Sequence, residues 1–171
     1  MKIPYSHIVK NIKQNVSIDH LSNKLFQLGH EHEIENDIFD MEFTPNRGDC
    51  LSLRGLLRDL AAFYDIENDL DLYQDNIEDL EINFKNLSKK ACPKISFLMI
   101  EIDSKIKEYN DELKEYFKDL SLKRNNFFTD ISNYVSYELG QPTHCYDLEK
   151  ISLDISFELT NEKINFNTLF D

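Results

Sequence analysis

Tryptophan is absent from the sequence, and glycine, proline and cysteine are all scarce. The 171 residues include four glycines, four prolines and three cysteines, and the cysteines, Cys50, Cys92 and Cys145, lie far apart. An odd number of separated thiols argues against a disulfide framework and a Cys-x-x-Cys metal site, and a reducing cytoplasm fits this usage best. No apolar run approaches the length of a membrane span, and the first residues lack the basic-then-apolar layout of a signal peptide.

Basic residues are also in deficit. Lysine and arginine number 19 against 32 acidic residues, which gives a formal net charge of −13. Binding nucleic acid through its phosphates requires clustered positive charge, so a broad RNA-binding surface is not predicted and any RNA contact is expected to be local and weak. The hydrophobic share of 41% and the charged share of 30% are those of an ordinary globular protein with one good core or two small ones.

Short strands and amphipathic helices alternate in the first part of the chain. After a short strand at the start, residues 18–28 carry an apolar stripe at helical spacing between Ser17, a favourable N-cap, and Gly29, a favourable stop. Residues 38–44 alternate apolar and polar side chains, which predicts a strand with its odd-numbered residues buried. The three residues before this strand have the length of a hairpin loop.

Residues 44–52 read Thr-Pro-Asn-Arg-Gly-Asp-Cys-Leu-Ser and lead into a second amphipathic helix, which Asp49 is expected to cap. Arginines near the polar side of this helix admit a phosphate site. We favour the alternative, a solvated helix face on which arginines pair with acidic neighbours. The residues concerned are Arg47, Arg54, Arg58, Asp59 and Glu67.

The sequence His30-Glu31-His32 invites a metal-site interpretation, because imidazoles two residues apart share one face of a strand. No further ligand stands nearby in the sequence. We therefore expect an exposed strand edge and no metal ligand set.

Residues 67–79 are acidic and carry few core-sized side chains, which is typical of a linker. We predict an α/β domain over residues 1–66, this linker, and a second domain over residues 80–171, so that the fold class is α+β with a mixed sheet in the second domain. The patterns of the second domain predict strands near residues 80–84, 94–102, 155–159 and 164–170, a short strand at residues 127–128 and a helix over residues 110–120.

Residues 130–147 combine a clear helix, a clear stop and clustered reactive side chains. Apolar residues recur at helical spacing, and Asp130 or Ser132 can cap the helix start. Gly140 suits the left-handed position that ends a helix, and Pro142 cannot continue one.

Beyond that stop the backbone must turn. The turn is expected to return Gln141, Thr143, His144 and Cys145 toward Ser132 and Asn133 in a compact polar site. Taken alone, such a histidine is more often a packed core residue. Cys145 admits a thiol nucleophile, which we disfavour because no third group in the sequence orients it.

These motifs resemble those of the β subunit of phenylalanyl-tRNA synthetase. In that family an Asp-x-Thr-Asn-Tyr start and a Gly-Gln-Pro-x-His end frame the amino-acid-editing domain, and residues 130–134 and 140–144 match them with serine in place of threonine. Residues 44–52 resemble the Pro-Asn-Arg-x-Asp-Cys-Leu signature near the start of the subunit. The Cys92-Pro93 pair before the apolar run of residues 95–100 resembles the strand that opens the editing domain.

The resemblance implies an editing pocket, and it marks a second motif to which it assigns no chemistry. The family's editing pocket removes tyrosine that has been wrongly joined to the tRNA. The resemblance implies that Ser132, Asn133 and His144 form this pocket here, with His144 as a proton carrier or hydrogen-bond donor. It marks Asn46, Arg47 and Asp49 as a structural or interface motif. No catalytic residue for aminoacylation and no metal ligand are implied in this chain.

The resemblance also implies partners and cofactors. ATP and Mg²⁺ are expected in the complete enzyme and none in this chain, an α subunit is the expected partner, and tRNA is expected to bind weakly if at all. The family's tRNA-binding barrel normally precedes the strand at residues 38–44, where only residues 35–37 intervene here, so we expect a form without it. We further expect a chain truncated within the editing domain and inactive alone. The alternatives are a free-standing hydrolase of mischarged tRNA and a non-catalytic interaction module.

Overall fold

The computed structural model of the 171-residue chain describes residues 1–66, 78–102, 108–163 and 165. Its contacts divide the chain into two compact units. The first unit comprises Met1–Leu72 and Lys105–Cys145, and the second comprises Tyr73–Ser104 and Tyr146–Asp171. Helices and small sheets occur together, so the expected α+β class is confirmed.

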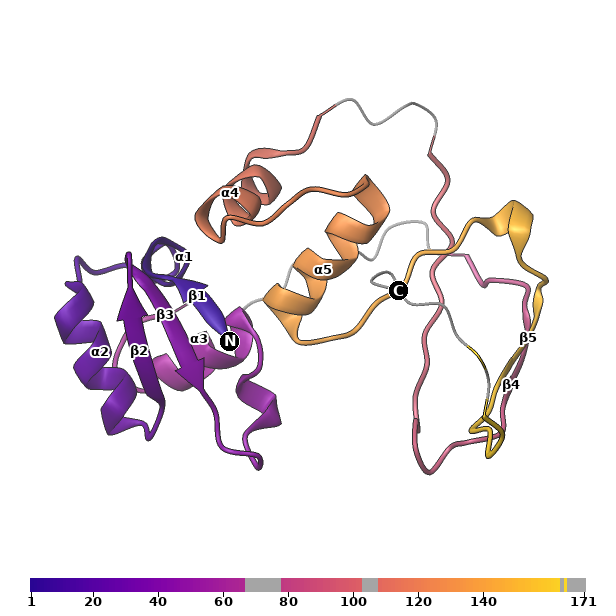
Figure 1. Ribbon diagram of the computed structural model, residues 1–171, viewed down its shortest axis with the longest axis horizontal. Coiled ribbons are helices and arrows are strands. Elements are labelled where there is room, and N and C mark those ends of the chain that lie inside the picture. The colour runs from indigo at the N-terminus through magenta and orange to yellow at the C-terminus, as the bar shows by residue number, and fades with distance from the viewer. Residues whose placement is uncertain (67–77, 103–107, 164, 166–171) are drawn as a thin grey trace. The chain divides into compact units, whose positions relative to one another are not determined.

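The first unit contains an antiparallel sheet of β1 (Lys2–Pro4), β3 (Ile38–Glu42) and β2 (Glu31–Glu35), with β3 in the centre (Figure 1). β2 and β3 form the predicted hairpin, in which Glu35 pairs with Ile38. Asn36 and Asp37 turn the chain with φ of 51° and 61°, the left-handed conformation that two-residue hairpin loops require. The predicted strand near residues 38–44 is therefore confirmed.

Three helices and a 3-10 turn accompany this sheet: α1 (Tyr5–Val9), α2 (Ile18–Gln27), η1 (Gly48–Cys50) and α3 (Leu53–Leu60). For α2 both predicted ends are confirmed, since the Ser17 side chain accepts a hydrogen bond from the His20 amide and Gly29 has a φ of 81°. For α3 the predicted cap was wrong. Ser52 caps the helix by accepting from the Gly55 amide at 2.9 Å, because Asp49 lies within η1 and its carboxylate binds arginines.

The core of the first unit forms where the apolar faces of these elements meet. Phe39 and Met41 are buried on one face of the sheet, as the alternation predicted, together with Ile3 of β1. Phe43, predicted on the same face, lies just beyond β3 and is half-buried. The helices contribute fully buried leucines to the same cluster: Leu21 and Leu25 from α2, and Leu56, Leu57 and Leu60 from α3.

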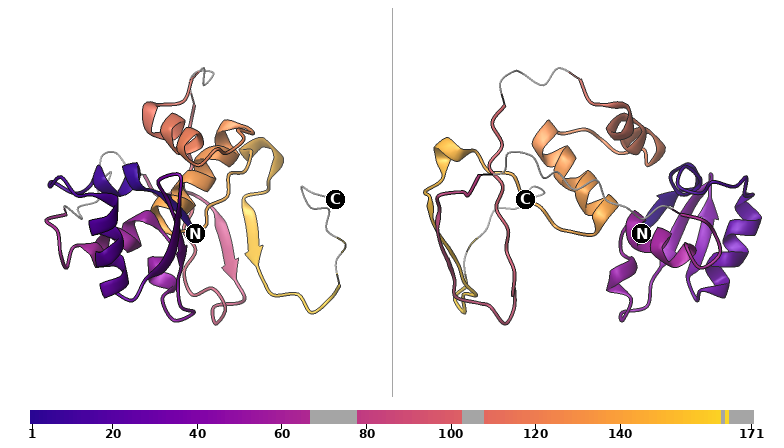
Figure 2. Two further views of the ribbon diagram at one scale, coloured as in Figure 1. Left: turned by 60° about the vertical axis from the view of Figure 1, so that its left-hand side comes forward. Right: turned by 180° about the vertical axis from the view of Figure 1, so that it is seen from behind.

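Two further helices, α4 (Asp111–Asp119) and α5 (Phe127–Leu139), lie side by side in both figures and pack within the first unit (Figures 1 and 2). The helix expected over residues 110–120 is confirmed as α4. The short strand expected at residues 127–128 was wrong, because Asn126 caps α5 through the Thr129 amide and begins the helix one turn before Asp130. No described helix is both long and apolar enough to span a membrane.

The contacts of α5 differ from those expected. We predicted that it packs on the sheet of a domain over residues 80–171, whereas it packs against α3 and contributes Tyr137 to the core of the first unit. The reason is that apolar side chains on α4 and α5 find their buried partners in the leucines of α3 and in α1. The sequence domains of residues 1–66 and 80–171 remain a prediction.

The second unit contains a parallel pair of β4 (Asn83–Asn86) and β5 (Asp154–Phe157), with the 3-10 turn η2 (Leu148–Lys150) before β5 (Figure 1). Strands were expected near both positions. The strand predicted over residues 94–102 was wrong, since these residues form no strand and side chains such as Leu98 are exposed. The strand predicted over residues 164–170 lies almost entirely outside the described residues, as does most of the predicted linker.

Candidate functional site

The turn after α5 folds back on the helix as predicted. Gly140, with a φ of 72°, ends α5 and donates its amide to the Ser136 carbonyl at 2.9 Å. The Ser136 hydroxyl then donates to the Gln141 carbonyl at 3.1 Å. The Ser132 hydroxyl donates to the Thr143 carbonyl and lies 2.9 Å from the Thr143 hydroxyl. We call residues 140–144 the return turn.

Of the predicted site residues, Ser132 is held against the return turn directly. His144 follows Thr143, so its backbone belongs to the same turn, and its side chain is exposed. Asn133 is also exposed on α5. The structure therefore brings Ser132 and Thr143 together, and the assignment of Asn133 and His144 to one site remains a prediction.

This surface is open to water. Hydroxyls, an amide and an imidazole supply hydrogen-bond donors and a proton carrier, but stabilising a developing oxyanion requires donors fixed in a site that excludes solvent. A hollow of about 550 Å³ in the first unit is lined by residues of α1, α2 and the chain around them together with Tyr64. None of the predicted site residues lines it.

Asp130, the first residue of the motif, has a role that sequence reasoning missed. It is fully buried, and its carboxylate accepts hydrogen bonds from the Tyr109 hydroxyl at 2.6 Å and from the Asn125 amide at 3.1 Å. The Arg124 guanidinium lies over the Tyr109 ring, 5.0 Å from its centre. Asp130 thus ties the start of α5 to the chain that precedes α4. A sequence signal was available, because Asn126 is a strong N-cap one turn earlier and leaves Asp130 inside the helix.

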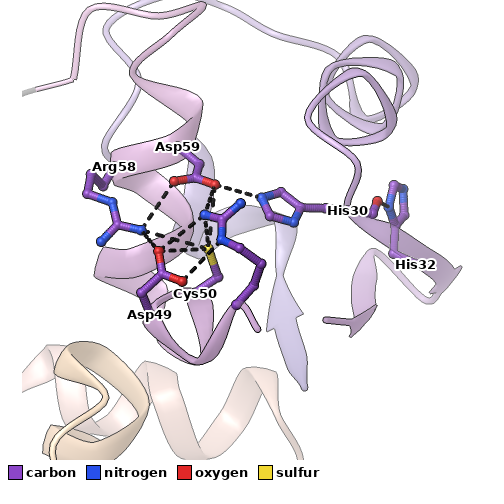
Figure 3. Close-up of polar contacts among 7 residues, drawn as sticks. His30, His32, Asp49, Cys50, Arg58 and Asp59 are labelled. Carbon is purple, nitrogen blue, oxygen red and sulfur yellow. Dashed lines mark hydrogen bonds and ion pairs between the residues drawn. The ribbon is translucent and has the colours of Figure 1, made fainter. Parts of the chain in front are cut away.

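The second motif, residues 44–52, contains a network of ion pairs (Figure 3). The Arg47 guanidinium donates to Asp49 at 3.1 Å and to Asp59 at 2.5 Å. Arg58 pairs with the same two carboxylates. We call Arg47, Asp49, Arg58 and Asp59 the arginine–aspartate cluster.

The pKa values in this cluster follow its contacts. The hydrogen bond from Arg47, aided by Arg58, lowers the pKa of Asp49 to about 2. Burial acts to raise the pKa of Asp59, but hydrogen bonds from Arg47, His30 and Arg58 lower it overall. The hydrogen bonds to Asp49 and Asp59 raise the pKa of Arg47 above its ordinary value. All four groups are therefore charged near neutral pH, and the phosphate site considered for these arginines is disfavoured because carboxylates occupy them.

His30, Cys50 and Asp59 are a candidate metal-binding group, because each offers one ligand atom and these three atoms lie within 4.8 Å of one another. The Arg47 guanidinium stands among them, 2.8 Å from the Cys50 sulfur. Burial raises the pKa of the Cys50 thiol to about 11, so the thiol is protonated and a poor metal ligand. The positive charge that a metal would bring is supplied by the guanidinium.

The exposed strand edge expected at His30 and His32 was wrong for the first of them. His30 is 2% exposed and its Nε2 lies 3.0 Å from the Asp59 carboxylate (Figure 3). His32 is half-buried, with Nε2 2.8 Å from the Ser22 hydroxyl and its ring stacked on Phe26. Both imidazoles are satisfied by neighbours distant in sequence, which the local pattern does not show.

One further polar cluster was not anticipated. His7 of α1 has Nδ1 2.8 Å from the Tyr137 hydroxyl and Nε2 3.3 Å from the Asp119 carboxylate, which also accepts from Ser6. Desolvation lowers the pKa of His7 despite the neighbouring carboxylate. The arrangement resembles a catalytic relay, but His7 and Tyr137 are both buried, so it connects α1 to α4 and α5 and presents no group to a substrate.

The comparisons agree with the motif-based resemblance. The family described as B3/4 domain matches residues 91–171. Among curated proteins, the chain is 33% identical over 134 residues to the phenylalanine–tRNA ligase beta subunit of Psychrobacter arcticus, and 30% identical over 160 residues to that of Rhodopirellula baltica. These alignments cover 74% and 88% of this chain. The resemblance is confirmed.

The chain is much shorter than these relatives. The alignments cover 16% of the Psychrobacter arcticus protein and 23% of the Rhodopirellula baltica protein. A third relative, from Rickettsia felis, is 34% identical over 134 residues, again with 16% of its length covered. No solved structure gives a significant match.

Proposed function

We propose that this chain is part of the β subunit of a phenylalanine–tRNA ligase, where it supplies an N-terminal α/β portion and an editing-type portion. The observation that carries the proposal is similarity over 88% of the chain to a protein with that name, through both motifs. In this interpretation the chain supports the ATP-dependent attachment of phenylalanine to its tRNA, in protein biosynthesis in the cytoplasm. Its partner is the α subunit of the ligase.

We expect ATP and Mg²⁺ to bind in the rest of the complete enzyme. The three arginines considered for phosphate binding each pair with a carboxylate: Arg47 and Arg58 with Asp49 and Asp59, and Arg54 with Glu138. A phosphate would have to displace these carboxylates, which supports a nucleotide site elsewhere in the complete enzyme. The net charge of −13 also supports weak tRNA binding by this chain alone.

Within the editing-type portion, we assign the pocket to Ser132, Asn133 and His144. The contact between Ser132 and Thr143 supports this assignment because it holds the turn that carries His144 against α5. His144 would accept or donate a proton, and the hydroxyls and the Asn133 amide would orient the substrate carbonyl and water. Since the surface is exposed, further walls are needed, and we expect the isolated chain not to deacylate tyrosyl-tRNA.

Two assays test the proposal. The first asks whether the chain co-purifies with the α subunit encoded in the same genome, and whether phenylalanylation of tRNA by the complete ligase falls when the chain is removed. Failure of both results would overturn the proposed ligase role.

The second assay measures deacylation of tyrosyl-tRNA by the isolated chain, by the complete ligase and by both carrying His144→Ala. We expect turnover only in the complete ligase and its loss in His144→Ala. Turnover by the isolated chain that His144→Ala removes would instead establish a free-standing hydrolase. No deacylation in either form, with α-subunit binding retained, would establish a non-catalytic module.

A further inference from the structure

We propose that residues 47–52 and the first turn of α3 form a positioning surface for the return turn of residues 140–144. One sequence motif would thereby hold the other in place, and residues 47–52 would act on the candidate site without touching a substrate. The consequence for editing rests on the proposed function. The positioning itself does not.

The direct contact is between Gly140 and Ser52. A β-carbon added at Gly140 would lie 3.1 Å from the Ser52 β-carbon and 3.3 Å from its hydroxyl oxygen, with the Leu51 carbonyl at 3.5 Å. The backbone of the return turn therefore lies directly against the N-cap of α3. Gly140 serves two purposes, because its φ of 72° ends α5 and its missing side chain permits this approach.

An ion pair two residues from Ser52 on α3 and two residues from Gly140 on α5 supports the same contact. Arg54 of α3 lies 3.4 Å from the Glu138 carboxylate of α5, and both side chains are about three-quarters buried, with 29% and 25% of their surfaces exposed. Glu138 also hydrogen-bonds Tyr134, whose pKa is raised by burial and by this carboxylate. The C-terminal turn of α5 thus has two independent contacts with the first turn of α3.

The surface that receives Gly140 is itself fixed. Arg47 and Arg58 connect Asp49 in η1 to Asp59 near the end of α3, and His30, just before β2, lies 3.0 Å from the Asp59 carboxylate (Figure 3). Gly55 lets the Asp49 carbonyl approach so closely that an added β-carbon would lie 2.1 Å from it. Cys50 is fully buried between these groups. The arginine–aspartate cluster therefore prevents Ser52 from moving away from the return turn.

The chain offers a matched control for testing this contact. Gly29 ends α2 with a φ of 81°, close to that of Gly140, but nothing lies within 4 Å of its added β-carbon. An alanine at either position suffers the same left-handed strain, so a difference between Gly140→Ala and Gly29→Ala reports the contact with Ser52. Ser52→Gly removes the opposing side chain, and glycine remains an acceptable N-cap.

The experiment measures amide hydrogen exchange of the full chain at two matched sites, each hydrogen-bonded at a helix end: residue 140 with Leu139 at the end of α5, and residue 29 with Leu28 at the end of α2. The amides of α4 serve as an internal reference. We expect Gly140→Ala to speed exchange at residue 140 and Leu139 about tenfold more than Gly29→Ala speeds it at residue 29 and Leu28, because only the first alanine meets Ser52. The double variant Ser52→Gly/Gly140→Ala should restore most of the protection.

Two outcomes would overturn the positioning: equal acceleration of exchange by the two glycine variants, each at its own helix end, or no rescue by Ser52→Gly. Deacylation by the complete ligase is measured on the same variants. A rescue of exchange with no deacylation in any form leaves the positioning intact and removes the editing role. A parallel loss and recovery of kcat, with KM unchanged, supports both.

Discussion

The two units of this chain differ in how far their apolar side chains are buried. Every fully buried hydrophobic residue among those described lies in the first unit, where helices and a three-stranded sheet surround one cluster. In the second unit, Leu98 is 76% exposed and Ile100 is 70% exposed, beside a sheet of only two strands. A two-stranded sheet offers too little surface to bury such side chains, and pairs of this kind are marginal by themselves. The difference shows that an apolar run becomes a core element only where a second layer covers it.

The sharpest test of this comparison is a matched pair of leucine truncations. Leu56→Ala should lower the free energy of unfolding by about 3–5 kcal/mol, because it leaves a cavity in a closed core. Leu98→Ala should change it by less than about 0.5 kcal/mol, since the side chain is already exposed. Urea unfolding followed by circular dichroism measures both. Similar losses for the two variants would show that the second unit has a core of its own under these conditions.

Asp130 provides a second test within the first unit. Asp130→Ala should lower the free energy of unfolding by about 3 kcal/mol, because the Tyr109 hydroxyl and the Asn125 amide lose a buried acceptor. Asp111→Ala, at an exposed position in the first turn of α4, should cost less than about 1 kcal/mol. The same unfolding assay serves for both variants. An Asp130→Ala protein as stable as the wild type would mean that these donors find water.

The arginine–aspartate cluster should make the first unit sensitive to acid. The pKa of Asp49 is about 2 in the folded chain against an ordinary value of 3.8, and the pKa of Asp59 is lowered as well. Because the folded pKa values are the lower ones, the charged carboxylates stabilise the fold above pH 3.8, and this contribution is lost as the pH falls from there through about 2.

Arg47→Gln removes the main hydrogen-bond donor to the Asp49 and Asp59 carboxylates. It should therefore weaken the dependence of the unfolding free energy on pH between pH 3.8 and about 2. Lys114→Gln, which removes exposed pairs with Glu108 and Asp111, should leave it unchanged. Unfolding curves collected between pH 5 and pH 2 would show the effect. A slope identical in the wild type and Arg47→Gln would contradict it.

The smallest expected effect concerns the ion pair between α3 and α5. Arg54→Gln and Glu138→Gln should each cost about 0.5 kcal/mol, and the double variant should cost less than their sum because the two residues interact. A second double-mutant cycle on the pair Lys10 and Glu115, which joins α1 to α4, serves as the control. These side chains are more exposed, so their coupling free energy should be smaller. A coupling of zero for Arg54 and Glu138 would mean that the contact observed here does not stabilise the chain.

The predictions that succeeded concern features encoded within a few residues. Ser17 and Gly29 fix the two ends of α2, the alternation of β3 fixes its buried face, and Gly140 with Pro142 fixes the return turn. In each case a helix cap or a pleat requires only neighbours in sequence, so composition and spacing were enough.

The predictions that failed depend on partners far along the chain. His30 is buried because Asp59, which is distant in sequence, lies beside it. The cap of α3 is an exception, since Ser52 accepts from the Gly55 amide within the same turn and local sequence could have shown it. Residues 94–102 form no strand because no neighbouring strand pairs with them in the described residues. The site assignment to Ser132, Asn133 and His144 came from the resemblance, and it remains a prediction. The contact between Ser132 and Thr143 followed from the turn itself.

The hairpin of β2 and β3 has a consequence for how this architecture gains or loses whole modules. Glu35 and Ile38 face each other as the last pair of the ladder, and the two residues between them are exposed. A polypeptide spliced in after Asn36 would leave and re-enter the fold at adjacent points, so the sheet would keep its register whatever the size of the graft. An engineer wishing to tether a reporter or a binding domain to this chain has a ready splice point there.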